Sequence, residues 1–109
     1  MTPEANQYYH KACSLSDESK YEEAVEQLNI AIQMSPDDAL LYTKLAGMYS
    51  ELSDWDNAVE AYKKALKLRP NDAFIYISLG NIFEQMQDYK NAYTAYNHAM
   101  KIFPEYKYN

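Results

Sequence analysis

The sequence predicts an all-α superhelix of three helix-turn-helix repeats. Two observations lead to this prediction: a period of 34 residues, and helical spacing of the apolar residues inside each period. The period is clearest for alanine, which recurs at Ala24, Ala58 and Ala92 and again at Ala31, Ala65 and Ala99. A fixed period of this length indicates stacked copies of one supersecondary unit. Apolar residues three or four positions apart, such as Leu41, Leu45 and Met48, favour helices over strands.

Six antiparallel helices are expected, two in each repeat. Their approximate bounds are residues 3–17, 21–34, 37–52, 55–68, 71–86 and 89–103. Pro3, Pro36 and Pro70 stand where the first helix of each repeat should begin, because proline suits a first helical turn but not a helix interior. The connections between the predicted helices are short, so neighbouring helices should form antiparallel hairpins.

The second helix of each repeat needs a residue that caps its first turn. Asp54 and Asp88 stand just before these helices in repeats two and three, where a carboxylate can accept hydrogen bonds from free backbone amides. Lys20 takes this place in the first repeat. The cap of that helix must therefore differ, and Ser19 is the candidate.

The repeated alanines have a predicted packing role. A methyl group opposite large side chains, such as Tyr49 and Tyr62, lets two helix axes approach closely. The same seam recurs in every repeat, so all three repeats are expected to form a single domain over residues 1–109.

These residues resemble the tetratricopeptide repeat (TPR) family. The family pattern is Trp or another aromatic residue, then Leu-Gly and Tyr, followed by Ala, an aromatic residue, Ala and Pro. The third repeat matches it most fully, with Tyr76, Leu79, Gly80, Phe83, Tyr89, Ala92, Tyr96, Ala99 and Pro104. The copies cover residues 5–38, 39–72 and 73–106. Lys11 stands where leucine is expected, which fits a terminal repeat with one face in water.

The resemblance implies an adaptor or scaffold, with no enzymatic activity and no cofactor. In this family the first helices line a concave groove that holds a peptide or a segment of another protein. The groove candidates are Asn6, Tyr9, Cys13, Leu40, Thr43, Lys44, Phe74, Ile77, Ser78 and Asn81. An alternative stays open, in which Leu40, Phe74 and Ile77 pack against neighbouring helices. Three functional classes also stay open: an independent adaptor, the recognition arm of a larger protein or enzyme, and a small dimeric TPR chaperone.

One known kind of TPR groove is not expected here. Chaperone-binding members grip a C-terminal carboxylate with a clamp of paired Lys, Asn and Arg side chains. The matching positions hold Tyr9, Cys13, Lys44, Phe74 and Ser78, which leaves one cation. Because the paired charges are gone, the sequence predicts no binding of chaperone tails. The groove should instead suit an apolar or basic-flanked segment.

The outer face of the last helix is the second candidate surface. Tyr93, Tyr96, Met100 and Phe103 are predicted to lie there, with no further helix to cover them. An uncovered apolar face marks an interface. Two explanations stay open: the chain is a fragment of a longer protein, or the face pairs with a second copy. Tyr106 and Tyr108 stand outside the repeat pattern and are further candidates for partner contact.

Composition argues against several other functions. The net charge of -6 disfavours nucleic acid as a partner, since phosphates are bound by clustered Lys and Arg. No apolar run reaches the roughly 18 residues that span a bilayer, so no membrane association and a cytoplasmic location are expected. Cys13 is the only cysteine, and with His10 and His98 it falls short of the about four ligands of a zinc site.

Overall fold

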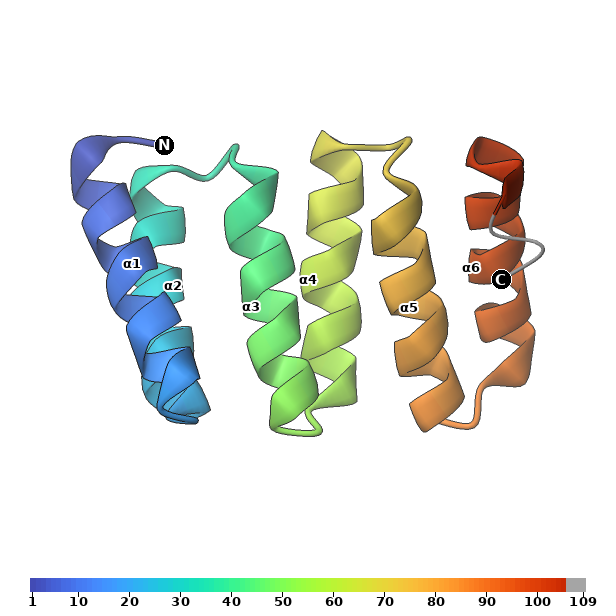
Figure 1. The fold of residues 1–109 in the computed structure, drawn as a ribbon, viewed down its shortest axis with the longest axis horizontal. Helices are drawn as coiled ribbons and strands as arrows, with labels where there is room; N and C mark the ends of the chain where they lie inside the picture. The colour runs from blue at the N-terminus through green and yellow to red at the C-terminus, as the bar shows by residue number, and fades with distance from the viewer. Residues whose placement is uncertain (106–109) are drawn as a thin grey trace.

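The computed structural model describes residues 1–105, and Tyr106 and Tyr108 lie outside this range. The described residues form six helices and no strand, as the sequence predicts. The helices are α1 (Pro3–Asp17), α2 (Tyr21–Met34), α3 (Ala39–Glu51), α4 (Trp55–Leu68), α5 (Ala73–Gln85) and α6 (Tyr89–Ile102). They stand side by side in chain order and alternate in direction (Figure 1).

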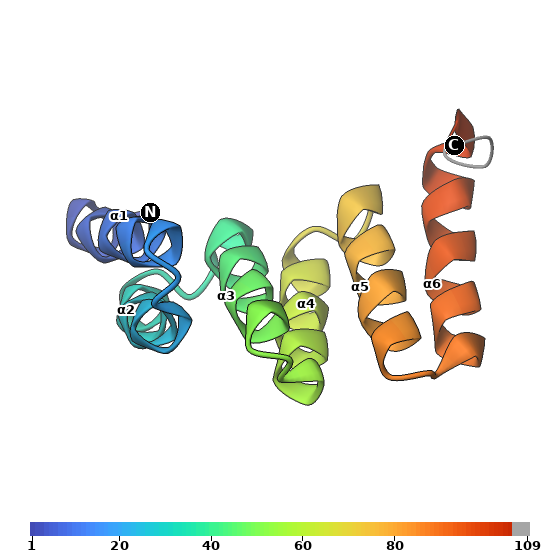
Figure 2. The same ribbon diagram turned by 60° about the horizontal axis from the view of Figure 1, so that its bottom comes forward.

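The helices pack in pairs that stack into a superhelix. Each repeat is a hairpin, α1 with α2, α3 with α4 and α5 with α6, and neighbouring repeats meet where α2 packs on α3 and α4 on α5. Figure 2 shows the twist of the stack, because α1 and α2 are seen nearly end-on whereas α6 is seen from the side. The result is an elongated body of 39 × 25 × 21 Å. The turns inside the repeats lie at one edge of this body and the loops between repeats at the opposite edge (Figure 1).

The repeated alanines form the seam between the helices of each hairpin. Ala24, Ala31, Ala58 and Ala65 are completely buried, and Ala92 and Ala99 are at most 3% exposed. Ala24 and Ala31 share a buried cluster with Leu28 and Leu41, and Tyr49 and Tyr62 pack against this cluster. The predicted burial of these alanines is therefore confirmed.

The starts of α3 and α5 differ from the prediction. Both helices begin two residues later than expected, because Asp38 and Asp72 are N-caps and not first-turn residues. Each carboxylate accepts a hydrogen bond from the second backbone amide that follows it, at 3.0 Å in both cases. Pro36 and Pro70 consequently lie in the loops between repeats. Pro3 does occupy the first turn of α1, as predicted.

The caps of the second helices follow the prediction in two repeats out of three. Asp54 and Asp88 cap α4 and α6 by accepting from the backbone amides of Asn57 and Asn91. The prediction that Ser19 caps α2 is wrong, since no side-chain hydrogen bond caps this helix. Ser19 instead adopts a left-handed backbone conformation, with φ of 61°, in the turn that precedes α2.

Candidate functional site

The ten predicted groove residues lie on the first helices of the three repeats, α1, α3 and α5. None of these ten described residues is buried. Four are exposed: Asn6, Leu40, Phe74 and Asn81. Six are half-buried: Tyr9, Cys13, Thr43, Lys44, Ile77 and Ser78. All ten side chains therefore expose some surface.

Tyr9, a predicted groove residue, has side-chain partners on α1. Burial raises the pKa of Tyr9, and a side-chain hydrogen bond with Cys13 and the charge of Asp38 act in the same direction. The ring of Tyr9 also lies against His10, with 5.6 Å between ring centroids. Tyr9 is thus an ordered, half-buried aromatic side chain that offers part of its surface to a ligand.

Two predicted groove residues of α5 form hydrogen bonds with tyrosines of the second helices. Ser78 makes a side-chain hydrogen bond with Tyr62 of α4, whose pKa is raised by burial and lowered by this bond, with a net rise. The side-chain oxygen of Asn81 accepts a hydrogen bond from the hydroxyl of Tyr96 at 2.6 Å. These contacts fix the polar side chains along α5 before any partner binds.

The position of Tyr96 corrects the prediction that it lies on the outer face of α6. Its ring packs over Gly80 of α5, which leaves room for it because glycine has no Cβ. Its hydroxyl also hydrogen-bonds to Glu84. Burial and this contact with a carboxylate raise the pKa of Tyr96 to about 12. Tyr96 therefore belongs to the contact between α5 and α6.

Gly47 lies beside open space on α3. A Cβ built on Gly47 would meet nothing within 4 Å. This glycine lies inside the helix, where glycine costs about 1 kcal/mol relative to alanine. Packing does not require a glycine here. The free space beside the α3 backbone is available to a partner.

Comparison with protein families agrees with this architecture. A model described as tetratricopeptide repeat matches residues 5–38 and 75–106, and a model described as TPR repeat matches residues 46–87. The chain belongs to the tetratricopeptide repeat family. No curated protein matches this TPR chain in sequence.

Solved structures of TPR proteins superpose closely on the chain. A crystal structure of MamA gives a TM-score of 0.88 at 24% identity and covers 96% of the chain, which spans 61% of MamA. The Sgt2 TPR domain from Aspergillus fumigatus gives 0.85 at 23% identity, with 93% of this chain and 67% of that domain covered. The Arabidopsis OM64 TPR domain gives 0.83 at 22% identity, with 92% and 83% covered. Likeness at this level of identity concerns the fold, and the function of the TPR chain must be argued from its own surface.

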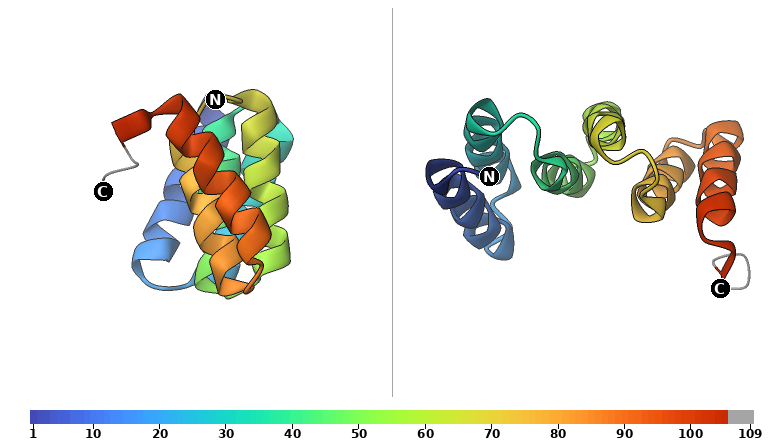
Figure 3. Two further views of the ribbon diagram at one scale, coloured as in Figure 1. Left: turned by 90° about the vertical axis from the view of Figure 1, so that its right-hand side faces the viewer. Right: turned by 90° about the horizontal axis from the view of Figure 1, so that it is seen from above.

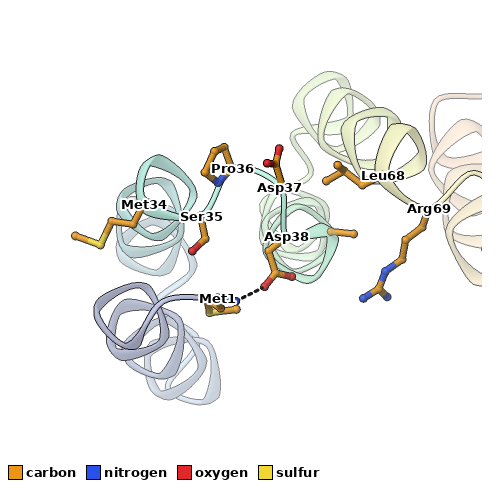
Figure 4. A pocket seen from close by; sticks show the side chains of 9 residues that line it. Met1, Met34, Ser35, Pro36, Asp37, Asp38, Leu68 and Arg69 are labelled. Atoms are coloured by element: carbon orange, nitrogen blue, oxygen red, sulfur yellow. Dashed lines mark ion pairs between the residues drawn. The ribbon is translucent and has the colours of Figure 1, made fainter.

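The loops between TPR repeats carry a second surface that the sequence reasoning missed. A cavity of about 470 Å³ lies between repeats one and two, and Figure 4 shows Asp38 at its centre between Met1 and Arg69. A cavity of about 580 Å³ lies between repeats two and three, lined by residues 69–74, Ile102 and Phe103. The two cavities are equivalent under the 34-residue step.

Most of the exposed large apolar side chains gather along this loop edge. Six of the eight found in residues 1–105 lie there: Met1, Met34, Leu40, Leu68, Phe74 and Phe103. The recurrence of Met34, Leu68 and Ile102 at the ends of the second helices could have revealed this edge. Leu40 and Phe74 consequently belong both to the predicted groove and to the loop edge.

The remaining two exposed apolar side chains lie on α6. Tyr93 is 69% exposed and Tyr89 is 65% exposed. Of the other residues predicted for this face, Phe103 is exposed and Met100 is half-buried.

None of the helices is long and apolar enough to cross a membrane, as far as residues 1–105 are concerned.

Proposed function

We propose that the chain is a protein-interaction module that binds a segment of another protein in the groove of α1, α3 and α5. The observation that carries this proposal is the accessible row of groove side chains beside the opening at Gly47. The family membership supports a role in protein binding in general. The groove supplies apolar and aromatic steps at Tyr9, Leu40, Phe74 and Ile77, which suit an extended or helical segment with apolar side chains.

The proposed mode of binding does not use a carboxylate clamp. Of the five clamp positions only Lys44 carries a positive charge, and it is half-buried. A carboxylate held by one lysine lacks the paired, charge-assisted bonds that make such a clamp strong. Non-enzymatic binding is proposed for the same groove, since its side chains offer contact surface and no arranged nucleophile with its base.

The groove can be tested by filling it. Gly47→Arg adds a long side chain at a position of α3 where a Cβ would meet no neighbouring atom within 4 Å. Asn29→Arg makes the same addition of charge at an exposed position of α2, outside the predicted groove residues, and serves as the matched control. Proteins captured by the immobilised chain are compared by quantitative mass spectrometry, after circular dichroism has shown that both variants are folded.

The expected result is a set of partners lost with Gly47→Arg and kept with Asn29→Arg. Tyr9→Ala should reduce capture of the same set, since Tyr9 is the ordered aromatic side chain of α1. If Gly47→Arg and Asn29→Arg capture the same partners as the wild type, the groove is not the binding surface.

Self-association through the C-terminal face, a recognition role within a larger protein and a cytoplasmic location stay predictions. The first can be followed by sedimentation of the chain at increasing concentration. A mass that does not change with concentration would contradict it.

A further inference from the structure

The C-terminal half of α4 and the residue after it form the densest cluster of positive charge in the chain. Residues 63–69 hold four of the ten Lys and Arg residues and no Asp or Glu, in a chain whose net charge is -6. The four are Lys63, Lys64, Lys67 and Arg69. Lys63 lies 4.0 Å from Glu60, and Arg69 lies 3.9 Å from Asp72. Two of the four cations are therefore already paired.

The other two, Lys64 and Lys67, line a hollow between α3 and α4. Both are exposed, and neither forms an ion pair with any described residue. The hollow has a volume of about 170 Å³, and its other lining residues are Pro36, Tyr42 and Leu68. Figure 3 (right) looks down on the loop edge of the stack and shows α3 and α4 side by side there. Two unpaired cations thus stand beside an apolar and aromatic surface.

The next repeat shows what can cover the tyrosine of this hollow. The hydroxyl of Tyr42 donates to the carbonyl of Pro36 at 2.9 Å, and Tyr76 makes the equivalent bond one repeat later at 3.5 Å. The ring of His98 stacks on Tyr76, with 5.0 Å between centroids and 20° between planes. Lys64 stands 34 residues before His98 and has no ring. An aromatic side chain of a partner can lie on Tyr42 in the same way.

Neighbouring acidic residues do not neutralise the hollow. Two cations and no carboxylate line it. Glu60, one turn before Lys64, is the partner of Lys63. Asp37 follows Pro36 and lines the neighbouring cavity between repeats one and two. Counting Asp37 against the two lysines still leaves one positive charge in excess, so the hollow attracts an anionic group.

We propose that the hollow beside Lys64 and Lys67 binds an acidic segment of another protein that carries an aromatic side chain between its acids. The aromatic ring lies on Tyr42, against Pro36 and Leu68, and the carboxylates on either side pair with the two lysines. Complementary charge also speeds the encounter and excludes basic partners. None of the ten predicted groove residues lines the hollow, so this surface is separate from the groove of the proposed function.

A second copy of the chain offers no such segment among residues 1–105. Its exposed aromatic side chains are Phe74, Tyr89, Tyr93 and Phe103. None of these four has an Asp or Glu within two residues on both sides. The densest acidic stretch, residues 17–26 with five acids, carries no exposed large apolar side chain. The charge and the ring that the hollow favours therefore point to another protein.

Three synthetic peptides test the proposal against the full chain. The first has one phenylalanine with two aspartates on each side. The second has alanine in place of the phenylalanine, and the third has asparagine in place of every aspartate. All three are acetylated and amidated, so that no terminal charge contributes. They carry the same uncharged fluorescent label on a glycine linker, and binding is measured by anisotropy.

The first peptide should bind about fivefold or more tightly than either of the others, because the hollow takes up both the ring and the charge. Lys64→Glu should weaken its binding by about fivefold or more, since an attraction becomes a repulsion. Lys63→Glu is the matched control, because Lys63 is also exposed, the charge change is the same, and Lys63 does not line the hollow. Gly47→Arg should leave binding unchanged, which separates this surface from the groove. Circular dichroism checks that the variants are folded.

Five results would overturn the proposal. Three are equal or absent binding of the three peptides, an equal effect or no effect of Lys64→Glu and Lys63→Glu, and loss of binding with Gly47→Arg. The fourth is tighter binding of a labelled oligothymidine, which also carries rings between anions and would assign the hollow to nucleic acid. The fifth is a wild-type dimer in sedimentation that Lys64→Glu dissociates and Lys63→Glu does not, which would assign it to a second copy.

Discussion

The ring of Tyr96 lies directly over Gly80, so closely that a Cβ on Gly80 would come within 2.5 Å of Cε1 of Tyr96. The chain has only one other glycine, Gly47, and a Cβ there would meet nothing within 4 Å. Both glycines lie inside helices, α5 and α3. Substitution of glycine by alanine should therefore have opposite effects on the stability of the fold at the two positions.

Gly47→Ala should stabilise the fold and Gly80→Ala should destabilise it. Alanine is favoured over glycine inside a helix by about 1 kcal/mol, which Gly47→Ala gains in full. At Gly80 the added methyl group displaces the ring of Tyr96, and overpacking costs about 1–3 kcal/mol, more than the helical gain over most of that range. Chemical denaturation of the two variants and the wild type measures both effects. Equal stabilisation by both substitutions would show that Tyr96 moves aside without cost.

The contact of Tyr96 with Glu84 predicts a pH dependence at high pH. The pKa of Tyr96 is about 12 in the folded chain, against about 10 for an unfolded tyrosine. Burial raises it most, and the hydrogen bond to Glu84 and the negative charge of Glu84 act in the same direction. The folded state therefore holds this proton more tightly. The stability it provides is fully present below pH of about 10 and is lost as pH rises through 12.

Glu84→Gln should lower the pKa of Tyr96, because it removes the negative charge that opposes ionisation. The measurement is the tyrosinate absorbance during an alkaline titration, with Tyr96→Phe subtracted to isolate this residue. Titration in denaturant is the control, and there the difference between wild type and Glu84→Gln should disappear. An unchanged titration curve in Glu84→Gln would mean that burial alone sets this pKa.

Local spacing accounts for what could be predicted from the sequence, and contacts between helices account for the rest. The six helices and the buried alanines depend on residues within one or two turns, and the structure confirms them. The start of α3 depends on a choice between Pro36 in the first turn and Asp38 as the cap. In the structure Asp38 is the cap, and the hydroxyl of Tyr42 donates a hydrogen bond to the carbonyl of Pro36 at 2.9 Å.

Surface positions were harder to assign for the same reason. Tyr96 was expected on the outer face of α6, but the space above Gly80 exists only once α5 and α6 have packed together. The loop edge with its two cavities likewise arises from three repeats placed side by side. The spacing of residues within a single helix cannot predict such a feature.

The missing cap of α2 predicts a stabilising substitution. Lys20 has φ and ψ of -93° and 67°, close to the -90° and 77° of Asp54, so its backbone is already suited to a cap. Lys20→Asn should therefore stabilise the fold by about 0.5–1 kcal/mol, since asparagine caps without adding to the acidic charge of Glu22 and Glu23.

Asp54→Ala is the matching destabilising substitution, because it removes the side chain that caps α4. Asp54 accepts from the backbone amide of Asn57 at 3.4 Å and from its side chain at 2.8 Å. The expected destabilisation is about 1 kcal/mol, measured by denaturation alongside Lys20→Asn. If Lys20→Asn is neutral while Asp54→Ala destabilises, then the exposed ion pair between Lys20 and Glu18 offsets the new cap.

The residues at the clamp positions predict both a negative result and a gain of function. The wild-type chain should not bind an acidic peptide with a free C-terminal carboxylate, because only Lys44 is charged among the clamp positions. The five substitutions that install the family pattern are Tyr9→Lys, Cys13→Asn, Lys44→Asn, Phe74→Lys and Ser78→Arg. All five positions are half-buried or exposed, so the changed side chains can reach a ligand.

The five-substitution variant should bind this peptide by at least about tenfold more tightly than the wild type, since Lys and Arg then supply paired, charge-assisted hydrogen bonds. Isothermal titration calorimetry measures the difference. The same peptide with an amidated C-terminus is the control and should lose the gain, and added salt should weaken it because the site is open to solvent. Micromolar binding of the free-acid peptide by the wild-type chain, lost on amidation, would show that the groove grips a carboxylate with side chains outside the clamp positions.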